Sequence, residues 1–230
     1  MKLLALDTSS IACSVALQLD DAVSELHEEQ PREHTALLLP MIDSLLENAG
    51  AAVPDLDAIV LGNGPGSFIG MRIAASVAQG LAYAAGLRIV PVSSMAAVAA
   101  QVFDEHDAAE VVVAQDAHMN EVYLGVYRLD HGLVVAASPE RLHRKGVIQR
   151  DTDRHAGPRV AAGFGWQRYP ELLLANKDRF DAVADVLYPR ARYLLELGRA
   201  GVEGNVALEP RDVVPAYLRQ EVAAKPAGSS

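Results

Sequence analysis

The chain contains one cysteine, no long apolar run and a shortage of basic residues. Cys13 has no partner for an internal disulfide and lies in the apolar run 12–17, so we expect a buried thiol in a reducing cytosol. Nowhere do 18 apolar residues follow one another, and the short apolar run after Met1 ends at Asp7, unlike a signal peptide. These absences predict a cytoplasmic protein that neither spans a membrane nor is exported.

Basic residues are outnumbered by 30 acidic residues to 20, which gives a formal charge of -10. Sequence-independent binding to nucleic acid needs lysines and arginines that displace phosphate counterions, so we expect any role with RNA to be partial or shared. The local exception is the basic segment from Arg141 to Arg159. Such a segment is more often a solvated loop than an RNA surface, and contact of this segment with tRNA stays open.

Residues for metal or nucleophilic chemistry are scarce. No two of the seven histidines have the four-residue spacing that places both imidazoles on one helix face, so we expect no local metal site. Ser9, Ser67 and Ser93 lack the Gly-x-Ser-x-Gly elbow of a serine hydrolase, which argues against a peptidase. Asp116 and Glu121 are the best paired carboxylates, and we expect them to shape a hairpin.

Apolar periodicity and turn residues predict a β-β-β-α-β-α-β-α order in the first half of the chain. We expect strands at 3–6, 13–19, 23–27, 58–61 and 89–92, and helices at 35–49, 71–85 and 95–103. Gly50 and Gly86 are expected to stop the first two helices. Pro40 removes a backbone donor, which predicts a kink or a later helix start.

The second half begins with a similar pattern and then departs from it. We expect strands at 111–114, 121–127, 133–137 and 160–162, a basic stretch in place of the first helix, and a long helix at 182–200. Residues 223–230 contain no large apolar side chain and are expected to be disordered. The expected organisation is a first lobe at 1–104 and a reduced second lobe at 105–222, whose last helical segment could pack back on the first lobe.

Two copies of a three-stranded meander followed by helices and strands indicate the α/β architecture shared by actin, sugar kinases and Hsp70-type ATPases (the ASKHA fold). In that fold the first hairpin turn presents amides and hydroxyls to a nucleotide phosphate, and its Asp holds metal-bound water. Asp7, Thr8 and Ser9 occupy this turn. An equally weighted alternative is that these residues only satisfy a tight turn.

A glycine-rich loop at 62–74 has four glycines within nine residues. Such a loop lets a ligand, another backbone or another helix approach closely. It is neither a Walker loop nor a well-placed Gly-x-Gly-x-x-Gly. Gly64 and Gly66 are therefore candidates for a nucleotide site, and packing alone remains the alternative.

Several motifs together resemble the bacterial TsaB (YeaZ) family over most of the chain. They are the Leu-Asp-Thr-Ser opening at 6–9, His34-Thr35, the Gly-Pro-Gly-Ser-Phe-Ile-Gly-Met-Arg-Ile segment at 64–73, the Asp-Ala-His-Met-Asn-Glu-Val-Tyr segment at 116–123, and the Pro-Ala-Tyr-Leu-Arg segment at 215–219. Two positions depart from the family pattern, since Ile69 stands where threonine is usual and His118 where arginine is common.

The resemblance implies a non-catalytic subunit that works with TsaD and TsaE. That machinery places threonylcarbamoyl on N6 of the adenosine beside the anticodon in tRNAs that read codons beginning with A. The catalytic paralogue TsaD holds its metal through a His-x-x-x-His pair, and the corresponding stretch 93–99 has no histidine here. The family also implies a heterodimer with TsaD, a homodimer when alone, and contact with tRNA only through the complex.

We expect helices 35–49 and 71–85 to pack against the equivalent helices of TsaD. The residues assigned to this interface are His34, Leu38, Ile42, Leu45, Met71, Ala74, Val77, Ala78 and Leu81. The alternative is that these apolar stripes only cover the chain's own sheet. No cofactor is expected beyond weak ATP or ADP binding at a vestigial site formed by Asp7, Thr8, Ser9, Gly64 and Gly66.

Two other functions stay open. The first is an active ATP-dependent phosphotransferase of the same fold, which would use Asp7 for a metal and would bind ATP and magnesium in a calorimetric titration without a partner. The second is a self-associating protein unrelated to tRNA, which would leave threonylcarbamoyl levels intact when deleted.

Overall fold

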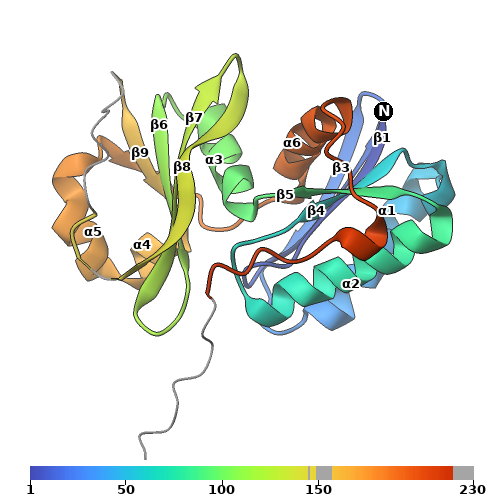
Figure 1. Ribbon diagram of the computed structural model, residues 1–230, viewed down its shortest axis with the longest axis horizontal. Coiled ribbons are helices and arrows are strands. Elements are labelled where there is room, and N and C mark those ends of the chain that lie inside the picture. Colours follow the sequence, from blue (N-terminus) through green and yellow to red (C-terminus); the bar gives the residue numbers. More distant parts are fainter. Residues whose placement is uncertain (145, 149–156, 220–230) are drawn as a thin grey trace, which may run out of the picture.

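The computed structural model describes residues 1–144, 146–148 and 157–219. In this part of the chain, two five-stranded β-sheets stand side by side with helices against their faces (Figure 1). Both sheets mix antiparallel and parallel pairs, so the fold class is α/β as expected. The expected tail at 223–230 lies outside the described residues.

The first sheet has the strand order β3-β2-β1-β4-β5. Its strands are β1 (Lys2–Asp7), β2 (Cys13–Leu19), β3 (Ala22–Glu28), β4 (Ala58–Gly62) and β5 (Arg88–Val92). Helices α1 (His34–Ala49) and α2 (Phe68–Ala85) cover one face, and α6 (Ala191–Glu203) covers the other. Successive side chains of a strand point to opposite faces, so Leu4 packs under α1 and α2 while Leu3 packs under α6. Burial on both faces explains why β1 is a continuous apolar run.

The second sheet has the order β10-β9-β6-β7-β8. Its strands are β6 (Glu110–Asp116), β7 (Glu121–Asp130), β8 (Leu133–Arg144), β9 (Arg159–Ala162) and β10 (Ala182–Val183). Helix α3 (Ser94–Glu105) covers one face, and α4 (Phe164–Arg168) and α5 (Pro170–Asn176) cover the other. We call the first sheet with α1, α2 and α6 the first lobe, and the second sheet with α3, α4 and α5 the second lobe.

The helix boundaries of the first lobe follow from residues visible in the sequence. Helix α1 ends at Gly50 and α2 at Gly86, both in the left-handed conformation that glycine adopts readily. Helix α2 begins three residues before its expected start because the Ser67 hydroxyl accepts a hydrogen bond from the Gly70 amide (3.2 Å). The expectation of a later start for α1 is wrong, since the helix begins at His34 and contains Pro40 on its exposed side.

The expected helix at 182–200 is wrong over its first nine residues. Ala182–Val183 forms a strand, and α6 begins only at Ala191. Pro189 supplies the reason, because the residue before a proline is pushed out of the helical region. Helices α4 and α5, for which no prediction was made, lie between β9 and this region, and α6 then packs on the first sheet through Leu194 and Leu195.

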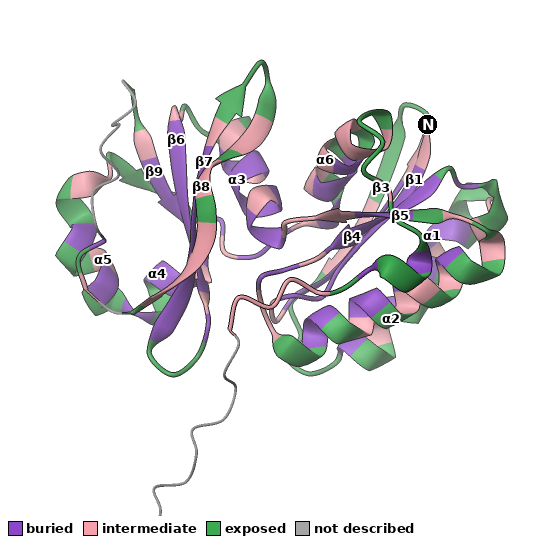
Figure 2. Ribbon diagram, viewed as in Figure 1, coloured by how far each residue is buried: buried purple, intermediate pink, exposed green. Residues whose placement is uncertain are grey.

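The apolar helix α2 and the single cysteine both belong to the core, which bears on the expectations drawn from composition. Helix α2 is long and apolar enough to cross a membrane by length and composition alone, yet Ala74, Ala78 and Ala82 on its inner face are fully buried against the first sheet (Figure 2). A core helix of a globular domain has these properties too. Cys13 is fully buried, and burial raises the pKa of its thiol to about 12.

Three short 3-10 turns complete the described chain, at Val53–Asp55, Lys177–Arg179 and Pro210–Asp212. After α6, Leu208 exchanges two backbone hydrogen bonds with Ile89 at the edge of β5 (2.8 and 3.0 Å). The chain then passes over α2 and runs toward the second lobe (Figure 1).

Candidate functional site between the lobes

The first turn of the chain follows β1 and is held by the Asp7 carboxylate. One oxygen of Asp7 accepts hydrogen bonds from the amide and the hydroxyl of Ser9 (both 2.8 Å). The other oxygen accepts from the Ser94 hydroxyl (2.6 Å). All three residues are buried. Burial raises the pKa of the Asp7 carboxyl, and the hydrogen bonds from Ser94 and Ser9 oppose that shift.

The glycine-rich loop packs directly onto this turn. The Ser67 amide donates to the Ser9 carbonyl (2.6 Å), and the Thr8 hydroxyl donates to the Gly70 carbonyl (2.6 Å). A Cβ at Gly66 would clash with the Ser9 carbonyl, and one at Gly70 would clash with the Thr8 carbonyl. These glycines therefore let one backbone approach another, which is one of the readings that the sequence left open.

Ser94 links the loop to the turn, and its role was missed in the sequence. The neighbouring Ser93 caps α3, and its hydroxyl accepts from the amides of Met95 and Ala96 (3.2 and 3.1 Å). The Ser94 hydroxyl accepts from the Gly64 amide (3.0 Å) while it donates to Asp7. The available signal was topological, because the carboxyl ends of parallel β1, β4 and β5 meet at one edge of the sheet.

The second lobe contributes the turn between β6 and β7. One Asp116 oxygen accepts from the His118 amide and from the Tyr169 hydroxyl (both 2.8 Å), so Asp116 shapes this hairpin as expected. The Glu121 backbone closes the same hairpin, because its amide donates to the His118 carbonyl and its carbonyl accepts from the Ala117 amide (both 3.0 Å). The Glu121 carboxylate pairs with Arg144 and Arg219 (3.0 and 2.6 Å).

The two turns face each other across a cleft of about 660 Å³. Ser9, Ser10 and His34 line it from the first lobe, and Asp116 and His118 line it from the second. The His34 Nε2 lies 2.8 Å from the Ser10 carbonyl oxygen. Hydroxyl and apolar groups dominate the lining. Among the described residues that line the cleft, one is an arginine, Arg32. The cleft could take a small molecule with few charges.

The structure gathers the residues expected at a vestigial nucleotide site. Asp7, Thr8 and Ser9 form the turn, and Gly64 and Gly66 lie in the loop that packs on it. The polar side chains among them point into the protein and bond one another or nearby residues. In the described ranges, no group of three or more His, Cys, Asp and Glu side chains is placed to hold a metal ion.

The residues expected at the partner interface fall into two sets. Val77 and Leu81 are partly buried and reach the surface. The others are buried within this chain, and their place at a partner interface stays a prediction; they are His34, Leu38, Ile42, Leu45, Met71, Ala74 and Ala78. The physical reason is that the apolar stripe of a helix marks the side facing its own sheet.

The basic segment from Arg141 to Arg159 is not a continuous solvated loop. Arg141 and Arg144 belong to β8, which runs beyond its expected end. Arg159 begins β9 and pairs with Glu110 (2.6 Å). Residues 145 and 149–156 of this segment lie outside the described residues.

Removal of the Asp7 carboxylate should destabilise the protein. Asp7→Ala leaves the Ser9 amide and the Ser94 hydroxyl buried without an acceptor, so we expect a loss of about 2 to 4 kcal/mol in the free energy of unfolding. Urea denaturation followed by circular dichroism measures it, with the exposed Asp43→Ala on α1 as the control. An Asp7→Ala protein as stable as the control would show that this carboxylate has no structural role.

Comparison with known proteins gives the class first. The family described as TsaD, tRNA N6-adenosine threonylcarbamoyltransferase, matches residues 24–149, which is more than half of the chain. The chain therefore contains a TsaD-like domain within its two-lobed α/β fold.

Relatives then define the family within that class. The TsaB protein of Escherichia coli is 37% identical over 230 residues, covering 98% of this chain and 97% of that protein. The TsaB protein of Haemophilus influenzae is 36% identical over 236 residues, covering 96% of this chain and 95% of that protein. The solved structure of YeaZ from Pseudomonas aeruginosa has a TM-score of 0.87 and 39% identity, covering 94% of this chain and 99% of that one. The chain belongs to the TsaB family, which confirms the resemblance seen in its motifs.

Proposed function

We propose that this chain is a non-catalytic subunit that supports TsaD, together with TsaE, in threonylcarbamoyl transfer to tRNA. The transfer acts on N6 of the adenosine beside the anticodon in tRNAs that read codons beginning with A. The relatives named for threonylcarbamoyladenosine biosynthesis, each matched along nearly its whole length, support the pathway. In this proposal the protein acts in the cytoplasm.

The state of the Asp7 turn is the observation that carries the non-catalytic role. A carboxylate that coordinates metal-bound water must face the cleft, whereas Asp7 is 1% exposed and accepts three hydrogen bonds from its own protein. The glycine loop fills the space next to it. A catalytic role would require this packing to open.

We also propose that the two lobes derive from the ASKHA architecture. In each sheet a three-stranded antiparallel meander is followed by two strands parallel to the first strand. The second sheet has the same pairing senses in β6 to β10. This agreement supports a duplicated motif, with helices of different length and position in the second lobe.

We place the partner surface on the outer faces of α1 and α2. Ile69 is 70% exposed at the start of α2, and Ile73, Val77 and Gly80 follow it at three- to four-residue steps. Ile73 and Val77 are partly buried at the edge of the first-lobe core, and Gly80 is exposed. Leu39 adds an exposed apolar side chain on the neighbouring α1. Gly80 has open space around it, so another helix could approach closely. The equivalent helices of TsaD, or of a second copy, would pack here.

Contact with tRNA is proposed to run through the complex. Several arginines are already paired with acidic side chains, which lowers the charge available for phosphate. These pairs are Arg144–Glu121, Arg159–Glu110, Arg190–Glu25 and Arg219–Glu121.

Reconstitution tests the proposed role. With TsaD, TsaE, tRNA and the donor substrate present, omission of this chain should reduce threonylcarbamoyl transfer to background, measured by mass spectrometry of tRNA nucleosides. Addition of this chain should restore transfer only when TsaD and TsaE are also present, because the chain is expected to supply no chemistry of its own. Full transfer without the chain would overturn the proposal.

The docking surface is tested by one exposed position on α2. Ile69→Arg places a charge in an apolar contact, so we expect affinity for TsaD to fall about tenfold or more in a calorimetric titration. Leu174→Arg on α5 is the matched control, because Leu174 is 68% exposed and Ile69 is 70% exposed. Both variants should retain the thermal stability of the parent protein, since both side chains point to solvent. Equal affinities for the two variants would move the interface elsewhere.

A further inference from the structure

The last described segment, residues 213–219, joins the two lobes, and we call it the strap. It follows the turn Pro210–Asp212, which packs on α2, and it then crosses to the second lobe. Figure 1 shows it running on the α2 side of the first sheet, away from α6. The strap has no helix or strand of its own, so its position depends on its contacts with the two lobes.

The strap is anchored to the first lobe by backbone and side-chain contacts. The Asn63 side-chain amide donates to the Val214 carbonyl (3.0 Å), and the Asn63 backbone carbonyl accepts from the Ala216 amide (3.2 Å). The Arg72 Nε donates to the Tyr217 hydroxyl (2.8 Å). The Tyr217 ring lies 5.3 Å from the Phe68 ring, and the Arg72 guanidinium lies 3.7 Å from the centre of the Phe68 ring. The first turn of α2 is thus tied to the strap.

Arg219 anchors the strap to the second lobe. Its guanidinium donates to a Glu121 carboxylate oxygen (2.6 Å) and to the Ala117 carbonyl (2.8 Å). The Arg219 side chain is 16% exposed and that of Glu121 is 10% exposed, so water screens this pair less than a surface pair. The two contacts fix the guanidinium at the base of the turn between β6 and β7.

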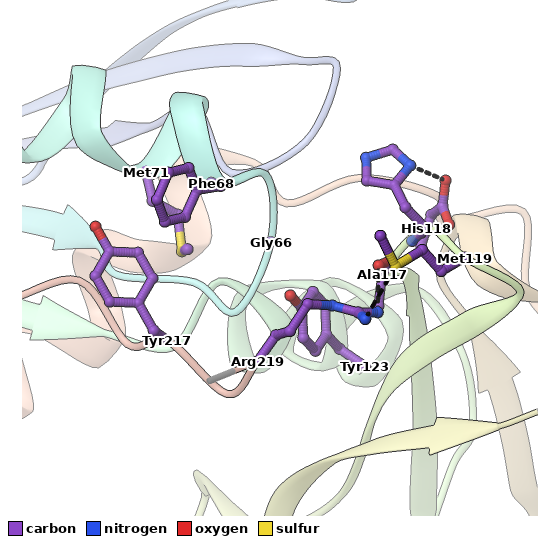
Figure 3. Close-up of a pocket in the computed structure, with 10 residues that line it drawn as sticks. Gly66, Phe68, Met71, Ala117, His118, Met119, Tyr123, Tyr217 and Arg219 are labelled. Carbon is purple, nitrogen blue, oxygen red and sulfur yellow. Dashed lines mark hydrogen bonds and ion pairs between the residues drawn. The ribbon is translucent and has the colours of Figure 1, made fainter. Parts of the chain in front are cut away.

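A small cavity of about 120 Å³ lies beneath the strap (Figure 3). Phe68 and Met71 line it from the first lobe, Tyr123 from the second, and Tyr217 and Arg219 from the strap. The lobes therefore meet here through a partly filled contact, in which the strap supplies the connection.

Helix α3 supplies two further ties between the lobes. Its first residue, Ser94, bonds Asp7 and Gly64 of the first lobe (2.6 and 3.0 Å), and its contact with α6 lies on the opposite face of the first sheet. There the Tyr193 hydroxyl of α6 donates to the Asp104 carboxylate of α3 (3.0 Å). The α3–α6 contact and the strap lie on different faces of the first sheet. Rotation of one lobe about the α3–α6 contact would have to stretch the strap.

We propose that the strap is a conformational latch, in which Tyr217 and Arg219 hold the two lobes in one orientation and keep the cleft at its observed width. Release of either anchor allows the second lobe to swing about the α3–α6 contact. Because Phe68 and Arg72 belong to the helix proposed for docking, the latch connects that helix to the second lobe. The latch itself needs no partner, so it can be tested on the isolated chain.

Pulsed dipolar electron paramagnetic resonance can test the latch. Spin labels at Glu47→Cys on α1 and Leu174→Cys on α5 report the distance between the lobes, since both positions are exposed. Cys13 is fully buried and does not compete for the label. Labelled protein is diluted with unlabelled protein, so that a second copy contributes no distance. We expect one narrow distance distribution for the parent chain.

Three single variants decide the outcome. Arg219→Ala and Tyr217→Ala should each broaden the distribution or shift it, while circular dichroism shows both lobes folded. Arg211→Ala is the matched control, because Arg211 lies just before the strap, its side chain is 85% exposed, and it meets Asp212 only at 4.0 Å. Distributions for Arg219→Ala and Tyr217→Ala that superimpose on the parent would overturn the latch, and so would equal broadening by Arg211→Ala. Neither result depends on whether the chain supports TsaD.

Discussion

The buried Asp7 carboxylate is the interaction on which the junction between the first sheet, the glycine-rich loop and α3 depends. Its two oxygens bring together the end of β1 and the start of α3, and Ser94 extends the connection to Gly64 in the loop after β4. A buried carboxylate is tolerated only when its lone pairs are occupied, so these donors must stay in place. The glycines at 62, 66 and 70 make the geometry possible, because a Cβ at any of them would clash with Asp7, Thr8 or Ser9.

The packing around Asp7 also fixes which face of α2 is buried and which face is exposed. Helix α2 starts from the loop that Asp7 and its neighbours hold, and its small inner residues pack on the sheet. Its outer face keeps apolar side chains that this chain does not cover, among them Ile69. The proposed role as a supporting subunit rests on the closed Asp7 turn and on these exposed apolar side chains of α2. The strap would then carry the position of α2 across to the second lobe.

Much of the fold could be predicted from the sequence, because strands and helices of the first lobe are set by local patterns. Buried strands are short apolar runs, and Ser67, Gly50 and Gly86 mark helix ends. The helix expected at 182–200 is wrong over residues 182–190, because Pro189 interrupts the apolar spacing that predicts it. In the site, the residues of the Asp7 turn and the glycine loop were identified, but Ser94 was not, since it lies 87 residues from Asp7 and only the topology joins them. The interface residues were chosen by apolar periodicity, and that criterion finds buried positions such as Leu38 and Ala78.

The central claim is that the Asp7 turn holds the protein together and performs no chemistry. Phosphate release from ATP by the isolated chain, measured with magnesium present and with magnesium removed by a chelator, tests it most directly. The account predicts release at background in both conditions, and the same background for Asp7→Asn. Magnesium-dependent release by the parent chain that disappears in a folded Asp7→Asn variant would contradict it.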